Sequence, residues 1–144
     1  MTESSKKYAQ KSMEIAETFL KSAKATLKIG DLRTAVDRAY YAMFHAAQAV
    51  LVWMGISPPR THRGLRNSFG RNVVLKGLCD KRFGKMLTKG FNMRQVGTYT
   101  IDAHFDKESV KELIEDAQRF VEEMKRIMKN TKMRKTSHPL QQFG

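Results

Sequence analysis

The most apolar stretch of the chain runs from Asp31 to Met54, and its polar side chains fall on one narrow strip when the segment is drawn as a helix. Nearly all its other positions hold Ala, Val, Leu, Met or an aromatic residue. A helix that is apolar over most of its circumference must be buried on most sides. We therefore predict a central helix enclosed by others. The polar strip consists of Thr34, Arg38, Tyr41, His45 and Gln48.

Four further segments repeat apolar residues at steps of three or four, the spacing typical of amphipathic helices. They cover residues 5–29, 62–74, 80–96 and 106–129. Gly30 and Asp31 predict a tight turn into the central helix, while Thr61 and Asp106 are suitable N-caps for the third and fifth segments. No segment shows the alternation of a strand. The pattern predicts an all-α fold, an up-and-down antiparallel bundle of four to five helices.

The helical pattern ends near Lys129, and the remaining residues are polar, basic and interrupted by proline. We expect one helical domain over residues 1–129 and a disordered basic tail over 130–144. A chain of 144 residues is long enough for one hydrophobic core and too short for two comfortable ones.

The charge balance is strongly positive, with 27 Lys and Arg against 14 Asp and Glu, a net charge of +13. Such a surplus favours an anionic partner, which would be a nucleic acid, a nucleotide or an acidic protein. The alternative is a basic surface that serves only solubility.

The single cysteine, Cys79, excludes an intramolecular disulfide framework and is typical of a reducing compartment. The longest apolar run, around Ala46 to Met54, is much shorter than the ~20 residues of a membrane-spanning helix. We therefore expect a cytoplasmic protein with no membrane association.

The sequence contains no recognisable metal or cofactor motif. Its four histidines are widely separated, and it has neither a glycine-rich phosphate loop nor a nucleophile elbow. We expect no metal and no cofactor.

The densest basic region lies in the middle third of the chain, where arginines and lysines recur without a recognised base-reading element. Arginine matches the geometry of phosphate, so contact with nucleic acid would be mainly to its backbone. The polar strip of the central helix either lines a groove that holds a phosphate or a base, or is a solvent-facing line. The candidate nucleotide- or RNA-binding residues are Arg38, Tyr41, His45, Arg60, His62, Arg63 and Arg66.

Arg94 falls on the same face of its predicted helix as Phe83, Leu87 and Phe91, which point toward the core. A buried arginine requires an acidic partner because an unpaired buried charge is costly. We predict that Asp37 on the central helix is that partner.

Three pieces of the sequence carry a family resemblance. Residues 37–47 read DRAYYAMFHAA, residues 61–65 read THRGL, and Arg94 is followed five residues later by Tyr99. Over residues 7–128, the chain resembles the HEPN-domain family of small prokaryotic helical proteins.

The resemblance implies a site and partners. HEPN ribonucleases place an arginine and a histidine, four to six residues apart, in the cleft of a homodimer and cleave RNA without a metal. In this sequence Arg94 matches the arginine, but Tyr99 stands where the histidine would be. Tyrosine, with a reference pKa of ~10, is a poor base at neutral pH. The candidate catalytic residues are nevertheless Arg94 and Tyr99.

Three functions follow from these observations. The leading one is a homodimeric HEPN-like module that binds RNA or a nucleotide, as the partner of a minimal nucleotidyltransferase in a toxin–antitoxin pair. The second is a metal-independent RNA-cleaving toxin that uses Arg94 with Tyr99, or with His45 or His62 across a dimer interface. The third is a structural protein whose basic surface docks an acidic partner.

Overall fold

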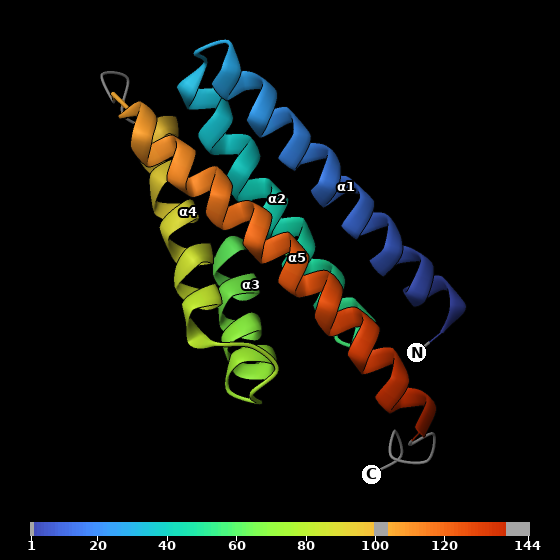
Figure 1. The fold of residues 1–144 in the computed structure, drawn as a ribbon. Helices are drawn as coiled ribbons and strands as arrows, with labels where there is room; N and C mark the ends of the chain where they lie inside the picture. The colour runs from blue at the N-terminus through green and yellow to red at the C-terminus, as the bar shows by residue number, and fades with distance from the viewer. Residues whose placement is uncertain (1, 100–103, 138–144) are drawn as a thin grey trace.

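The computed structural model describes residues 2–99 and 104–137, and these form helices with no strand among them (Figure 1). A turn of π-helix, η1, continues the third helix directly. The elements are α1 (Glu3–Lys28), α2 (Leu32–Trp53), α3 (His62–Phe69), η1 (Gly70–Val74), α4 (Lys81–Tyr99) and α5 (Lys107–Ser137). The predicted all-α helical bundle is confirmed.

The helix boundaries follow from local capping. The side chains of Asp31 and Thr61 accept hydrogen bonds from backbone N–H groups three residues later, at 3.2 and 2.9 Å, and so begin α2 and α3. Gly30 and Gly55 follow the first two helices with positive φ angles of 82° and 87°, a conformation that ends helices readily when the residue is glycine. These signals are visible in the sequence because they involve neighbours along the chain.

Helix α2 is the centre of the bundle, as its composition predicted. It packs against α1, α3, α4 and α5, and the tight turn at its start makes it antiparallel to α1 (Figure 1). Its fully buried side chains include Tyr40, Met43 and Leu51. Alanines contribute much of the remaining contact, and their small size allows neighbouring helices to approach closely. The position of α2 brings its polar residues to the junctions between helices.

Two helices extend beyond their predicted ends. Helix α4 continues through Tyr99, and α5 continues past Lys129 to Ser137, so part of the expected tail is helical. Thr131 is buried, at 7% exposure, so the packing of α5 continues past Lys129. Residues 138–144 lie outside the described residues, and the division of the chain at residue 129 stays a prediction.

None of the helices in the described ranges has a stretch both long and apolar enough to cross a bilayer.

Candidate functional site

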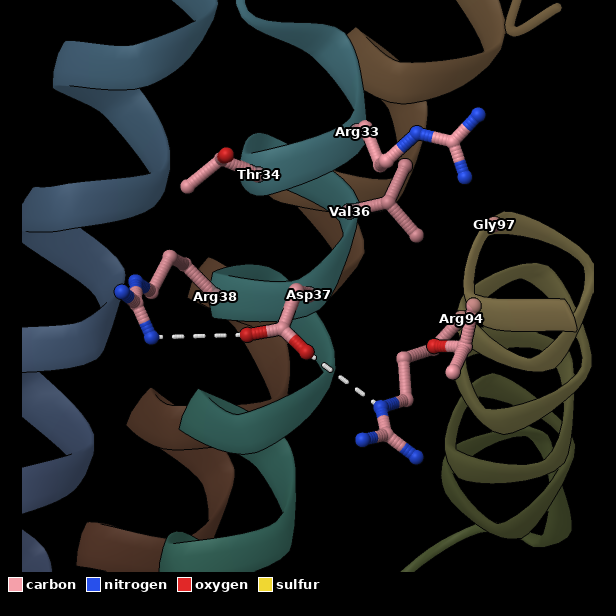
Figure 2. A pocket seen from close by; sticks show the side chains of 8 residues that line it. Arg33, Thr34, Val36, Asp37, Arg38, Arg94 and Gly97 are labelled. Carbon is pink, nitrogen blue, oxygen red and sulfur yellow. Dashed lines mark hydrogen bonds and ion pairs between the residues drawn. The ribbon is translucent and has the colours of Figure 1, made fainter. Parts of the chain in front are cut away.

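Two arginines from different helices bind the carboxylate of Asp37 on α2. Arg94 on α4 donates from Nε to Oδ1 at 3.2 Å, and Arg38 donates from Nη1 to Oδ2 at 3.4 Å. Figure 2 shows the carboxylate between the two guanidinium groups. The side chains of Arg94 and Asp37 are 20% and 33% exposed, so their pair is largely shielded from water. The structure thus places Arg94 beside the acid expected from the sequence.

A pocket of about 390 Å³ opens beside this carboxylate, between the first turns of α2 and the last turns of α4 (Figure 2). Three arginines and one aspartate line it, so the pocket carries a surplus of positive charge. The lining residues are Arg33, Thr34, Val36, Asp37, Arg38, Arg94, Gly97 and Thr98. A pocket with this charge is suited to an anion such as phosphate.

Gly97 allows α4 to approach its neighbours at the pocket. A Cβ atom at this position would lie 2.9 Å from Cζ of Phe105 and 3.7 Å from Cγ of Arg33. The first separation is shorter than the van der Waals contact distance of two carbon atoms, so a larger residue would displace α4 or the Phe105 ring. Gly97 therefore allows Phe105 to lie against α4 at the edge of the pocket.

A histidine with two tyrosine contacts lies next to the pocket. Nδ1 of His62, at the start of α3, is 2.7 Å from the hydroxyl of Tyr40, and Nε2 is 3.5 Å from the hydroxyl of Tyr41. Burial raises the pKa of Tyr40, so its phenol stays protonated at neutral pH. Burial also lowers the pKa of His62, and the nearby charges of Arg94 and Arg66 lower it further. His62 is therefore a neutral imidazole at neutral pH.

Tyr41 connects this histidine to the arginine of the pocket. The centre of the Arg94 guanidinium lies 5.1 Å from the centre of the Tyr41 ring, whose hydroxyl faces His62. Arg66 lies over the ring of Phe91 at 4.0 Å, and the centre of that ring is 5.4 Å from the centre of the His62 ring. Within the described part of the chain, Nη1 of Arg66 is buried without a hydrogen-bond partner. The surroundings of His62 thus combine arginine, a side chain that binds phosphate, with an imidazole that can transfer protons.

The polar strip of α2 is neither a single groove nor a solvent-facing line, so both interpretations of it were too simple. Helix α1 covers its middle: His45 stacks on Phe19 with ring centres 5.4 Å apart and planes inclined by 4°, and Arg38 lies 5.5 Å from the same ring. Burial lowers the pKa of His45. Gln48 is only 8% exposed. Of the strip, only Thr34 and Arg38 line the pocket.

Other candidates lie away from the pocket. Tyr99 ends α4 with its side chain 75% exposed and does not line the pocket. Arg60 and Arg63 are exposed around the start of α3 and do not line it either. The structure therefore gathers Arg38, Asp37 and Arg94 at the pocket, with Tyr41 in contact with Arg94 and His62. Arg66 is an electrostatic neighbour of His62 but does not line the pocket. The structure leaves the other candidates outside.

Reasoning from the sequence missed several residues of the site, among them Arg33 and Tyr40. Arg33 lines the pocket, and its position four residues before Asp37 places both on one helix face, a spacing that could have indicated it. Tyr40 forms a hydrogen bond with His62, but in the sequence it is indistinguishable from any other aromatic residue of the core. Across residues 2–99 and 104–137, no three His, Cys, Asp or Glu side chains come together as metal ligands.

Comparison with known proteins identifies relatives over most of the chain. The profile of the family described as HEPN domain matches residues 9–127. A Methanocaldococcus jannaschii protein named "Putative toxin MJ0605" is 36% identical over 117 residues, which are 81% of this chain and 86% of the relative. A "UPF0332 protein" of Thermotoga maritima is 33% identical over 117 residues, 81% of this chain and 88% of the relative. "UPF0332 protein PH1297" of Pyrococcus horikoshii is 33% identical over 134 residues, 93% of each chain.

Proposed function

The chain belongs to the HEPN-domain family, and from this premise we propose that it binds RNA or a nucleotide as the partner of a minimal nucleotidyltransferase in a toxin–antitoxin pair. The observation that carries the binding function is the pocket in which Arg38 and Arg94 are both held by Asp37. Its ligand would be the phosphate of a nucleotide or of an RNA strand.

The arginines of the pocket are positioned before a ligand arrives. Asp37 engages Arg94 through Nε, and within residues 2–99 and 104–137 neither Nη group of that arginine forms a hydrogen bond, so both can donate to another anion. Arg38 and Arg94 share the single carboxylate of Asp37, so this group of three charges carries a net positive charge. A phosphate would add negative charge beside them and accept paired hydrogen bonds from a guanidinium group. Because the groups are already in place, less conformational entropy is lost on binding.

The shape of the pocket supports a small part of a nucleic acid as ligand. Its volume of about 390 Å³ accommodates a nucleotide phosphate and its sugar but not a folded macromolecule. The polar lining consists mainly of cationic groups suited to phosphate, and contacts to phosphate position a strand without selecting its bases. We therefore expect little base preference.

The partners in this proposal rest on the relatives. One relative carries the word toxin in its name, which favours a toxin–antitoxin context for this chain. The nucleotidyltransferase partner and the homodimer rest on the family resemblance. Co-expression with a minimal nucleotidyltransferase of the same organism, followed by affinity capture of one protein, tests the partnership, and size-exclusion chromatography with light scattering tests the dimer.

Metal-independent RNA cleavage is a second candidate, and the position of His62 favours it. A neutral imidazole can accept the proton of a ribose 2′-hydroxyl, and Arg94 can stabilise the charge that develops on the phosphate. His62 and Arg94 belong to the same protomer and share contacts with Tyr41. His62 therefore suits this role better than Tyr99, which is exposed and outside the pocket.

Binding of a uridine dinucleotide with its 3′-phosphate tests the pocket. We expect Arg38→Gln and Arg94→Gln each to weaken binding roughly tenfold or more, because charged hydrogen bonds contribute about 1.5–3 kcal/mol. Arg119→Gln is the matched control: Arg119 also pairs with an aspartate at 3.2 Å, but on the exposed face of α5. Equal losses in all three variants would contradict the proposal.

Incubation of a single-stranded RNA with the full chain in excess chelator tests the second candidate. Cleavage that disappears in both His62→Gln and Arg94→Gln would establish it. Cleavage that persists in His62→Gln would assign proton transfer to another residue.

A further inference from the structure

A second cationic depression lies on the other side of α4 from the pocket, where α4 faces α3 and η1. It has a volume of about 660 Å³, and Val74 and Met93 contribute apolar side chains to it. Arg66 from α3 and three lysines from α4, Lys81, Lys85 and Lys89, complete its charged lining. No carboxylate lines it within the described residues. We call this depression the lysine groove.

The cations of the lysine groove are not neutralised by the protein. In the part of the chain that the structure describes, none of its lysines forms an ion pair, whereas Lys125 pairs with Glu17 at 2.9 Å elsewhere on the surface. The neighbouring Asp80 accepts a hydrogen bond from the backbone N–H of Arg82 at the start of α4. Together with the unpartnered Nη1 of Arg66, the lysines produce a positive field that favours an anion.

The spacing of the lysines indicates the kind of anion. Lys81, Lys85 and Lys89 follow one another at intervals of four residues, so they share a helix face and are separated by about 6 Å along its axis. This step is comparable with the separation of successive phosphates along an extended strand. A mononucleotide would use only part of such a row.

We propose that the lysine groove binds the backbone of single-stranded RNA. Apolar surface from Val74 and Met93 can lie against bases or sugars, while the lysines and Arg66 contact successive phosphates. No aromatic ring lines the groove among the described residues, so the contact does not select the base. An acidic protein segment fits less well, because the guanidinium of Arg66 and the regular row of lysines match repeated phosphates.

The groove extends the binding function proposed above and rests on it for the identity of the ligand. Both surfaces lie along α4, the groove on its N-terminal part and the pocket of Arg94 on its C-terminal part. Arg66 belongs to the groove and also acts electrostatically on His62. A strand held in the groove would thus be anchored beside the cluster of His62, and a longer RNA would bind more tightly than a dinucleotide.

The experiment compares two triple variants of the full chain. One removes the lysines of the groove, as Lys81→Gln, Lys85→Gln and Lys89→Gln. The control removes the same charge elsewhere, as Lys21→Gln, Lys28→Gln and Lys111→Gln, three exposed lysines without an ion pair in the described residues. Fluorescence anisotropy measures binding of a uridine 12-mer and of the dinucleotide over a series of salt concentrations, and circular dichroism confirms that both variants fold.

We expect the wild type to bind the 12-mer more tightly and with a steeper salt dependence than the dinucleotide. The groove variant should reduce the logarithmic salt slope of 12-mer binding by about 2, because each phosphate contact on a single strand contributes about 0.7. Its binding of the dinucleotide should not change. The control should preserve the wild-type slope for the 12-mer.

Three results would overturn the proposal. These are equal losses in the groove variant and the control, a 12-mer that binds no more tightly than the dinucleotide, and displacement of the 12-mer by an equimolar polyglutamate peptide. The second result leaves the proposed pocket intact if Arg94→Gln still weakens dinucleotide binding. Conversely, groove-dependent binding of the 12-mer without any binding of the dinucleotide supports the groove and contradicts the pocket.

Discussion

Replacement of Arg94 by alanine removes the ion pair that joins α4 to α2 at the pocket. The bond is a single one, from Nε to Asp37 Oδ1 at 3.2 Å, and the two side chains are 20% and 33% exposed. Asp37 keeps a second partner after the substitution, because Arg38 lies 3.4 Å away. The aspartate is therefore not left unpaired in the variant.

The size of the effect follows from this geometry. Exposed pairs contribute about 0.2–1 kcal/mol, and breaking a buried pair costs about 3–5 kcal/mol. The Arg94–Asp37 pair is partly shielded and its acid retains a partner, so losing it should cost about 1 kcal/mol, close to the range for exposed pairs. The contact of the guanidinium with the Tyr41 ring at 5.1 Å adds about 0.5 kcal/mol. We expect Arg94→Ala to reduce the free energy of unfolding by about 1–2 kcal/mol, a decrease in Tm of a few degrees.

Urea denaturation with a double-mutant cycle measures how much the Arg94–Asp37 ion pair contributes to the free energy of unfolding. The cycle combines Arg94→Ala with Asp37→Asn, and a parallel cycle replaces Arg38 instead. We expect a coupling of about 1 kcal/mol between Arg94 and Asp37. The coupling with Arg38 should be smaller, at about 0.2–0.5 kcal/mol, because that side chain is 40% exposed and its contact with Asp37 is longer, at 3.4 Å.

An unchanged stability of Arg94→Ala would refute the reasoning, because it would mean that the pair contributes nothing. A larger coupling for Arg38 than for Arg94 would also refute it. In that case, the pair within α2, and not the connection to α4, would determine the position of the carboxylate.

Two further predictions concern packing and pH. A Cβ atom at Gly90 would lie 2.6 Å from the methyl carbon of the buried Met43, so overpacking should outweigh the gain in helix propensity, and Gly90→Ala should destabilise the fold by up to about 2 kcal/mol in urea denaturation. Gly84→Ala should instead be neutral or stabilise the fold by up to about 1 kcal/mol, because the nearest atom is 3.7 Å away and alanine favours the helix. Equal changes in the free energy of unfolding for the two substitutions would contradict this account of the packing. Burial lowers the folded-state pKa of His62 and of His45, so the unfolded chain binds more protons and stability falls as pH decreases below about 6.5. Denaturation at several pH values should show a weaker fall for His62→Gln than for the wild type, and an equal fall in the two proteins would contradict the burial of His62.

Much of the fold was predictable because its signals are local. Helix periodicity, the N-caps at Asp31 and Thr61 and the glycines at helix ends involve residues no more than four positions apart. The end of α5 was predicted less well. Its apolar pattern weakens after Lys129, yet the helix continues to Ser137. Regular backbone hydrogen bonds can continue a helix after its apolar face ends.

The candidate site was only partly predictable. The position of Arg94 on an apolar helix face indicated an acidic partner, and the partner is Asp37, 57 residues earlier in the chain. The polar strip of α2 gave no indication that Phe19 of α1 would cover His45. Whether a polar strip is open or covered depends on which helix packs against it, and helical spacing carries no information on that.

The sequence by itself determined that this chain is a helical bundle with a buried central helix, a large positive charge and membership of the HEPN-domain family. Only the tertiary structure decided which cations remain without an acid and which histidine lies beside Arg94. The reason is that His62 contacts Tyr40, which lies 22 residues earlier in the chain, and that the lysine groove forms between α4 and the α3–η1 segment. Such contacts depend on how the helices pack in three dimensions, which periodicity along one helix does not specify.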